Sequence, residues 1–244
     1  MNKFKKLISI LIISSYTCIA PNQAHSGFER SHCYKIYKKK LYENLLRCTE
    51  KYADNGDAMA QFFMGKIYYE GLKTPRNYKK AFEWYSKSAK QSYRESENQL
   101  GTMFDQGKGT VQNYQSAYYW YTRAALKDLA DAQYNLADML FSGRGIQQNF
   151  RQAYIWSLVA ASNNHSEAVR LRDNLEISLK QPELVKTQNE ASKLDQDIKS
   201  GEAIKRFMAE EKAKELARLA AKAAKKKREA EALAKKMKKK ATKK

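Results

Sequence analysis

Residues 58–93 read AMAQFFMGKIYYEGLKTPRNYKKAFEWYSKSAKQSY, and this stretch decides the fold. Its most distinctive positions return twice more along the chain, each time 36 residues later. The recurring positions are Trp84, Trp120 and Trp156; Asn77, Asn113 and Asn149; Ala81, Ala117 and Ala153; and Gly71, Gly107 and Gly143. A fixed period of about 20 to 50 residues is the signature of a solenoid, in which each unit buries its apolar face against its neighbours. We therefore expect a repeat protein, a class that usually offers a surface to a partner rather than a catalytic centre.

Each unit is expected to fold as two helices joined by a short turn. In residues 58–70 the apolar side chains recur every three or four positions, which is typical of one buried helical face. Gly71 is placed to end this helix, and Pro75 prevents its continuation. Asn77 is a suitable N-cap for a second helix that extends to about Gln91, because its side chain can accept a hydrogen bond from a free backbone N–H.

Glycine also occurs inside the predicted first helices. Gly65 and Gly101 share one repeat position, and Ala137 occupies it in the third unit. Because glycine costs about 1 kcal/mol relative to alanine inside a helix, its reuse indicates close helix–helix contact. We expect the tryptophan of the second helix to pack near this small residue.

These motifs resemble Sel1-like repeats, which are relatives of the tetratricopeptide repeat. The shared pattern has an Ala-Gln start (Ala60-Gln61), a Gly-x-Gly turn (Gly107 to Gly109), and then Asn-aromatic-x-x-Ala-x-x-Trp-Tyr. The resemblance covers roughly residues 40–185. It implies an all-α fold, an α/α solenoid of helical hairpin repeats.

The pattern divides the chain into five segments. They are 1–26, a signal peptide; 27–57, a degenerate N-terminal capping hairpin; 58–165, three 36-residue repeats; 166–200, C-terminal capping helices that break near Pro182; and 201–244, a Lys/Ala-rich tail. In the capping hairpin, Leu41, Leu45, Leu46 and Tyr52 are expected to cover the first full repeat.

The first segment has the order of a secretory signal. Three lysines precede an apolar run from Leu7 to about Ile13, which is too short to span a bilayer. Cleavage could follow Ala24 or Ser26. An uncleaved membrane anchor and a lipoprotein signal at Cys18 are the alternatives. We expect the protein to be exported, and either periplasmic or secreted.

Removal of the signal leaves two cysteines, Cys33 and Cys48. Exported proteins meet an oxidising compartment, and a spacing of 15 residues suits facing sites on a helical hairpin. A disulfide here would fasten the terminal unit, which packs on one side only. Two small buried thiols are the alternative. Without nearby histidines the pair does not form a zinc site, and no metal ligands are expected.

The tail carries most of the positive charge. Residues 204–244 contain 17 Lys or Arg against 5 Asp or Glu, out of a net charge of +20 for the whole chain. Its composition favours a long basic helix, although its apolar stripe is too thin for a convincing coiled coil. The tail is either a solvated helix, partly disordered, or an anchor for an anionic lipid or envelope polymer. The candidate anionic-surface residues are Lys222, Lys225, Lys226, Lys227, Arg228, Lys235, Lys236, Lys238, Lys239 and Lys240. Nucleic acid is not the expected partner, because exported proteins rarely meet it and stacking aromatics are scarce here.

No catalytic or cofactor motif occurs in the sequence, so we expect a binding protein without a cofactor rather than an enzyme. The resemblance implies that a protein or peptide docks on a concave face lined by the first helices. The candidate partner-binding residues are Met59, Phe62, Lys66, Tyr69, Glu95, Asn98, Thr102, Asp105, Asp131, Tyr134, Asp138 and Phe141. A mixture of aromatic and acidic groups suits a peptide with basic and apolar side chains. Some of these residues, Phe62 and Phe141 especially, could instead be ordinary core.

Two alternative functions stand beside this adaptor. In one, the tail alone holds the protein electrostatically at an anionic surface. In the other, the protein binds or hydrolyses β-lactams, as is associated with some cysteine-rich Sel1-like proteins. Those proteins carry a cysteine pair in each repeat, whereas residues 58–165 contain no cysteine.

Overall fold

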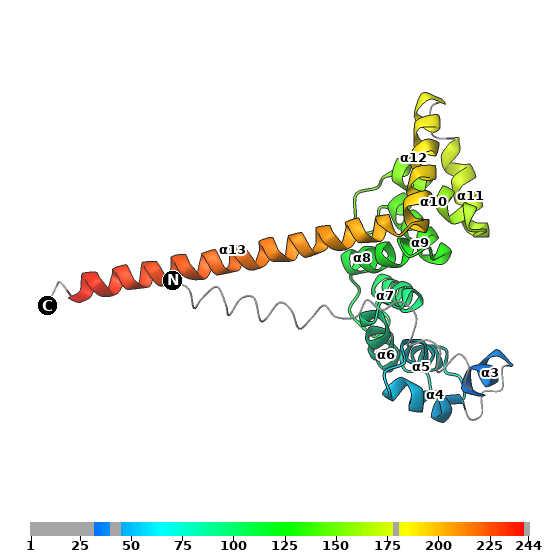
Figure 1. Ribbon diagram of the computed structural model, residues 1–244, viewed down its shortest axis with the longest axis horizontal. Helices are drawn as coiled ribbons and strands as arrows, with labels where there is room; N and C mark the ends of the chain where they lie inside the picture. Colours follow the sequence, from blue (N-terminus) through cyan, green and yellow to red (C-terminus); the bar gives the residue numbers. More distant parts are fainter. Residues whose placement is uncertain (1–31, 40–44, 178–180, 242–244) are drawn as a thin grey trace. The chain divides into compact units, whose positions relative to one another are not determined.

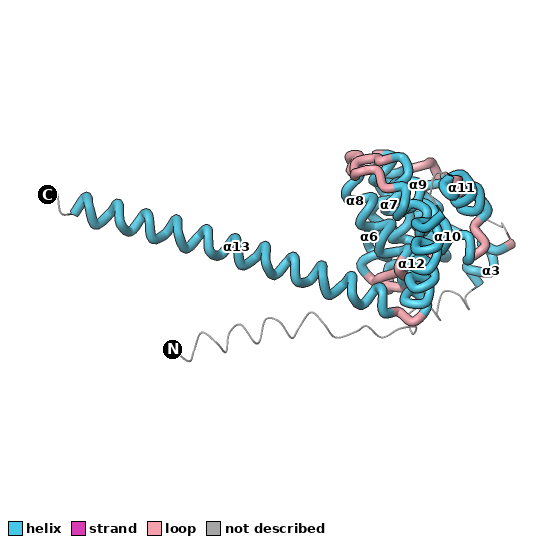
Figure 2. The backbone as a smooth tube through the Cα atoms, turned by 90° about the horizontal axis from the view of Figure 1, so that it is seen from above, coloured by secondary structure: helices cyan, strands magenta, loops and turns pink. Residues whose placement is uncertain are grey.

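The computed structural model describes residues 32–39, 45–177 and 181–241 (Figure 1). The predicted signal peptide lies outside these residues, as does Leu41. The described residues contain helices and no strands, and the connections between successive repeat helices are short (Figure 2). The helices are α3 His32–Lys38, α4 Leu45–Asp54, α5 Ala58–Glu70, α6 Tyr78–Lys90, α7 Arg94–Gln106, α8 Tyr114–Ala125, α9 Ala130–Ser142, α10 Phe150–Ser162, α11 Ser166–Glu176, α12 Gln181–Lys199 and α13 Glu202–Ala241. The all-α prediction and the hairpin repeats are confirmed.

The chain divides into two compact units, one up to Trp120 and one from Tyr121, so that α8 belongs to both. Each unit is built from consecutive antiparallel pairs of the kind that the repeat predicts. In unit 1, α5 packs on α4 and on α6, and α6 packs on α7. In unit 2, α10 packs on α9, α11 and α12.

The predicted turn chemistry forms the boundaries of the repeat helices. Gly71 has a φ of 75°, a left-handed conformation that glycine adopts without strain, and its N–H donates to the carbonyl of Ile67. Asn77 Oδ1 accepts the N–H of Lys80 at 2.9 Å. The caps of the next two repeats have the same geometry, with Asn113 accepting from Ser116 at 2.8 Å and Asn149 accepting from Gln152 at 2.9 Å. The asparagine N-cap prediction is confirmed at all three positions.

The close contact at Gly65 involves a different aromatic residue from the one predicted. A Cβ built on Gly65 would lie 2.5 Å from Cδ1 of Tyr85. Tyr85 is 1% exposed and forms the centre of the unit 1 core between α5, α6 and α7. Trp84 is half-buried and packs instead toward the α4–α5 side. The tryptophan prediction was therefore wrong, because adjacent residues on α6 point about 100° apart and only the second reaches the glycine.

The N-terminal hairpin covers the first repeat. Cys33 of α3 and Cys48 of α4 are joined as a disulfide, with their Cα atoms 5.5 Å apart. Leu45 is fully buried against α5, and Leu46 and Tyr52 pack at the edge of the same cluster. The rings of Tyr34 and Tyr37 lie 5.8 and 4.4 Å from the ring of Phe63.

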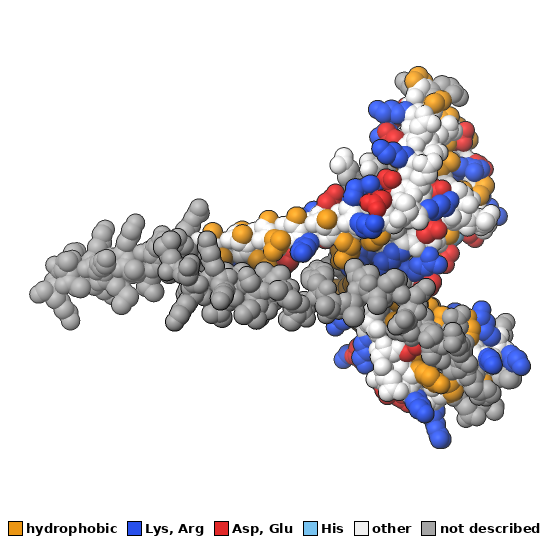
Figure 3. Space-filling view, in the orientation of Figure 1, with side chains coloured by type: hydrophobic (Ala, Val, Ile, Leu, Met, Phe, Trp, Pro, Cys, Tyr) orange, Lys and Arg blue, Asp and Glu red, His pale blue; other side chains and the backbone are white. Residues whose placement is uncertain are grey.

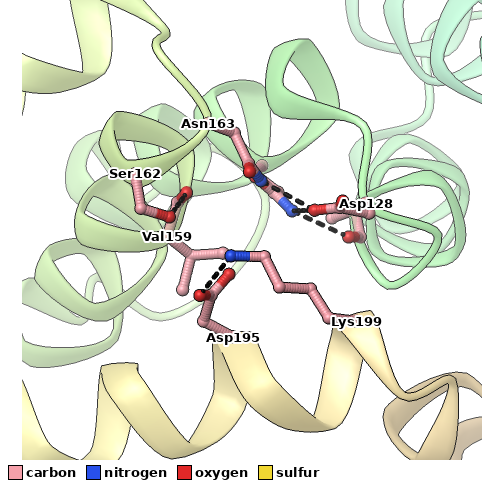
Figure 4. A network of polar contacts seen from close by, with 8 residues as sticks. Asp128, Val159, Ser162, Asn163, Asp195 and Lys199 are labelled. Carbon is pink, nitrogen blue, oxygen red and sulfur yellow. Dashed lines mark hydrogen bonds and ion pairs between the residues drawn. The ribbon is translucent and has the colours of Figure 1, made fainter.

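In unit 2 a polar network joins the end of α10 to the start of α9 and the turn before it (Figure 4). Buried Gln133 donates to the carbonyl of Ala125 at 3.2 Å. Asn163, which follows α10, donates to Gln133 Oε1 at 3.0 Å and to Asp128 Oδ1 at 2.7 Å. Gln61 has the corresponding place in unit 1, where it donates to the carbonyl of Ala53 at 3.0 Å. In the first and third repeats, the Gln of the Ala-Gln motif thus fastens the first helix to the end of the helix before it.

The C-terminal cap consists of α11 and α12, and Pro182 lies in the first turn of α12, where proline is tolerated. Gly201, with a φ of 78°, separates α12 from α13. The tail is a single helix of 40 residues, about 60 Å at a rise of 1.5 Å per residue. Its first turns pack on α12, since Ala203 is 5% exposed and Arg206 pairs with Asp197 at 2.7 Å.

Candidate protein-binding face

The predicted residues on the first helices are here called the first-helix face. In unit 1 they are Met59, Phe62, Lys66 and Tyr69 on α5 and Glu95, Asn98, Thr102 and Asp105 on α7; in unit 2 they are Asp131, Tyr134, Asp138 and Phe141 on α9. Within each helix the spacing of three and four residues places the four side chains on one side. Because the chain divides into two compact units, the face is described for each unit separately.

On α5 the face is aromatic and basic. The Phe62 ring lies 5.7 Å from Tyr85 and 5.4 Å from Tyr93, and its side chain remains half-buried. Phe62 therefore contributes to the core and also reaches the surface. Lys66 pairs with Glu70 at 3.6 Å and lies over the Tyr37 ring at 5.5 Å. Burial lowers the pKa of Lys66, but hydrogen bonding to Tyr37 and the charge of Glu70 outweigh burial and raise it.

A residue outside the predicted set completes this part of the face. Lys108, in the turn after α7, places its Nζ 3.3 Å from the hydroxyl of Tyr69. The ammonium also lies 5.5 and 5.6 Å from the ring centroids of Tyr69 and Tyr78. Its only signal in the sequence is that it occupies the variable position of a Gly-x-Gly turn.

On α7 the face is polar and unevenly accessible. Asn98 is 6% exposed, so it offers little surface to a partner. Thr102 is half-buried, and its hydroxyl donates to the carbonyl of Asn98 at 3.2 Å. Glu95 pairs with Arg94 at 3.3 Å, and Asp105 is half-buried at the end of the helix.

On α9 of unit 2 the face is acidic and aromatic. Asp131 and Asp138 have side chains 71% and 37% exposed, and Asp138 pairs with Arg144 at 2.9 Å. The Tyr134 ring stacks on His165 at 4.5 Å, and burial, with the nearby Asp138, raises the pKa of Tyr134. Phe141 is 37% exposed, so the expectation that it is ordinary core does not hold.

The His165 imidazole has a second role that the sequence did not reveal. Its Nδ1 accepts the N–H of Ala168 at 3.3 Å and so caps α11, while its Nε2 lies 3.6 Å from Asp131. The cap position could have been found from the repeat, since residue 165 ends the third unit. The residue type gives no such signal, because histidine is not among the preferred N-caps.

The described part of the basic tail is exposed after its first turns. Every side chain from Lys212 to Lys225 is exposed, Lys222 among them. Leu216 and Leu219 are 55% and 53% exposed, and hydrophobic side chains follow one another along this part of α13 (Figure 3). The remaining candidate anionic-surface residues have side chains outside the described set.

The described residues include neither a membrane-spanning helix nor a metal-binding group. No helix among them is both long and apolar enough to cross a bilayer. No group of three or more His, Cys, Asp or Glu side chains in the described ranges is arranged to hold a metal ion.

The fold and this face define a helical-repeat protein of the α/α solenoid class. The Sel1 repeat family matches residues 58–93, 94–129 and 130–165, the same boundaries that the 36-residue period gives. The chain is a Sel1-like repeat protein.

Similar proteins agree with this assignment. A sel1-like repeat-containing protein of Acanthamoeba polyphaga mimivirus is 48% identical over 40 residues, which are 16% of this chain and 7% of that protein. The solved structure of a protective antigen of uropathogenic Escherichia coli strains, described as displaying an SLR fold, is 30% identical with a TM-score of 0.57 over 68% of this chain and 36% of that one. A Sel1 repeat protein from Oxalobacter formigenes is 26% identical with a TM-score of 0.55 over 66% of each chain. The chain thus spans about a third of the antigen and a small part of the viral protein.

Proposed function

We propose that this protein is an exported adaptor that binds a protein partner on the first-helix face. One observation carries the proposal. Apart from Asn98, the residues of this face keep accessible surface, although most other residues of these helices are buried. Sel1 repeats generally mediate protein–protein interaction, and aromatic side chains with satisfied polar neighbours are common interface anchors.

The charges of the face support a partner with basic and apolar groups. Asp131 and Asp138 provide exposed carboxylates in unit 2. Tyr134, which lies between them on α9, and Phe141, which follows Asp138, provide apolar area. Charged groups at such a rim act mainly on the association rate and on specificity.

We further propose that the basic tail contacts an anionic surface. An exposed basic helix with leucines on its surface can lie on anionic lipid, where each Lys or Arg near the membrane contributes about 1 kcal/mol. The exposed run from Lys212 to Lys225, with Leu216 and Leu219, favours this role. If the tail alone binds, the protein is an electrostatic anchor and the repeats are a passive scaffold.

Export is part of the proposal. The basic and apolar pattern of residues 1–26 supports it, and so does the Cys33–Cys48 pair, since disulfides persist in oxidising compartments. Enzymatic action on β-lactams has no comparable support, because the repeats lack the cysteine pairs of the relatives associated with that chemistry.

Affinity capture from envelope extract with full-length variants tests the proposal. Asp138→Lys together with Asp105→Lys should remove a defined partner at both low and high salt. Lys222→Gln with Lys225→Gln should weaken only the salt-sensitive binding, because surface charges are screened at high ionic strength. Unchanged capture by the Asp variants would eliminate the first-helix face. Loss of all binding in the Lys variant would favour the electrostatic anchor.

A further inference from the structure

The same aromatic pair occurs at the turn of the first and third repeats. In the first repeat, Tyr69 ends α5 and Tyr78 begins α6, and their ring centroids are 5.2 Å apart. In the third repeat, Phe141 and Phe150 occupy the same two positions, and their ring centroids are 5.8 Å apart. The two pairs are thus equivalent in sequence and similar in geometry, so what lies against one can be compared with what lies against the other.

In unit 1 the pair is covered by a lysine from the following repeat. Lys108 lies over both rings, at 5.5 Å from the Tyr69 centroid and 5.6 Å from the Tyr78 centroid. Gly109, the next residue, lies so close to the carbonyl of Tyr78 that a Cβ would not fit. The Gly-Lys-Gly turn therefore packs directly on the aromatic pair, and the Lys108 ammonium lies beside the Tyr69 hydroxyl.

In unit 2 the equivalent pair is open. Phe141 is 37% and Phe150 is 43% exposed. The helix that follows the third repeat, α11, has 11 residues rather than the 13 of α9, and no glycine turn continues the register after it. Among the residues that the structure describes, no lysine or arginine lies over either phenylalanine ring.

The surroundings of the open pair are suited to a cation. Asp138 lies one helical turn before Phe141, so its carboxylate is on the same side of α9. Asp131 lies further along that side and is 71% exposed in its side chain. Arg144 is already paired with Asp138 at 2.9 Å. A cation over an aromatic face gains more where it is partly removed from water, as it would be over two adjoining rings.

We propose that Phe141 and Phe150 form the binding site for a Lys or Arg side chain of the protein partner, in the place that Lys108 fills in unit 1. This inference rests on the proposed adaptor function and names the chemistry of the partner at one point. The partner inserts the aliphatic stem of the basic side chain against the rings and directs the charged end toward Asp138.

A titration of full-length protein with a short peptide tests this site. The probe is residues 105–112, DQGKGTVQ, which contain the turn that covers the pair in unit 1. The matched control peptide has norleucine in place of the lysine, which keeps the stem and removes the charge. With phenylalanine-labelled protein, the ring resonances of Phe141 and Phe150 should shift, and the control peptide should bind about 3- to 30-fold more weakly.

Protein variants define the result further. Phe141→Leu with Phe150→Leu keeps apolar volume at the surface and should abolish the difference between the two peptides, with an unchanged circular dichroism spectrum. Equal binding of both peptides to the unaltered protein would overturn the inference. The inference would also be overturned if the ring resonances of Phe141 and Phe150 shifted when the protein concentration was raised without peptide. The site would then be occupied by a second copy of the chain.

One residue of the chain itself is a competing occupant. Lys180 has the repeat position of Lys108 and lies outside the described residues. Lys180→Ala should leave the ring resonances in place, and a large shift would show that the chain covers its own site. None of these outcomes bears on whether a partner docks at Tyr134 or on α5, so failure here is distinguishable from failure of the adaptor proposal.

Discussion

Gly65→Ala is expected to destabilise unit 1, although alanine is the better helix former. The new Cβ would lie 2.5, 2.6 and 2.9 Å from three ring carbons of Tyr85, against an ordinary carbon–carbon contact of about 3.5 to 4.0 Å. The difference between the ordinary contact distance and these distances is roughly 1 Å, so α5 and α6 must separate by about that much at this point. Tyr85 cannot swing away, because it is 1% exposed and enclosed by Ala81, Ala89 and Leu100.

The magnitude follows from two opposing terms. Overpacking a tight core costs about 1 to 3 kcal/mol, and a clash with a large buried ring is at the upper end. Replacing glycine by alanine in a helix returns about 1 kcal/mol. The net loss in the free energy of unfolding is about 2 kcal/mol, which urea denaturation followed by circular dichroism can measure.

The double variant with Tyr85→Leu is the control for this reasoning. A smaller side chain at position 85 removes the clash, so adding Gly65→Ala in that background should stabilise by up to about 1 kcal/mol. The sign of the alanine effect thus reverses between the two backgrounds. If Gly65→Ala stabilised the unaltered protein, the close contact between α5 and α6 would be wrong.

Three further predictions concern unit 1 and the repeat boundaries. Cys33→Ser should lower the free energy of unfolding of unit 1 by about 3 kcal/mol, which is the loop-closure value for a 15-residue spacing. In urea denaturation the unaltered protein with its disulfide reduced should show the same loss. Burial raises the pKa of Tyr85 and of Tyr93 above the 10.0 of an unfolded tyrosine. Because the folded state favours the neutral phenols, their contribution to the free energy of unfolding is complete below pH 10 and is lost as the pH rises above it. Absorbance should show that both phenols ionise abruptly when the protein unfolds. A smooth titration of both phenols near pH 10 would contradict this. Asn149→Ala removes the α10 N-cap and should cost about 1 kcal/mol in thermal unfolding, whereas Asn149→Ser should cost much less.

The repeat boundaries could be predicted from the sequence because they depend on local chemistry. Gly71 adopts a left-handed conformation and Asn77 caps α6, and both requirements involve only the neighbouring backbone. Three aligned copies made these positions visible without any knowledge of packing. The disulfide partners were predictable for a similar reason, since Cys33 and Cys48 are the only cysteines after residue 26.

Contacts between helices were less predictable. Trp84 and Tyr85 are adjacent aromatic residues, and the repeat pattern does not say which of them faces Gly65. Asn98 was placed on the binding face by its position in the helix, but its burial depends on the packing around α7. Lys108 was missed because its role appears only when two successive repeats are in contact.

The central claim is that a partner docks on the first-helix face, and site-specific photo-crosslinking tests it most directly. A photoreactive phenylalanine analogue at Tyr134 or at Phe62, in the full-length protein in its native host, should crosslink one defined protein from both positions. The same analogue at Glu83, exposed on the second helix α6, is the matched control and should give no such product. Crosslinks only from the tail position Leu219, or equal products from Glu83, would contradict the account.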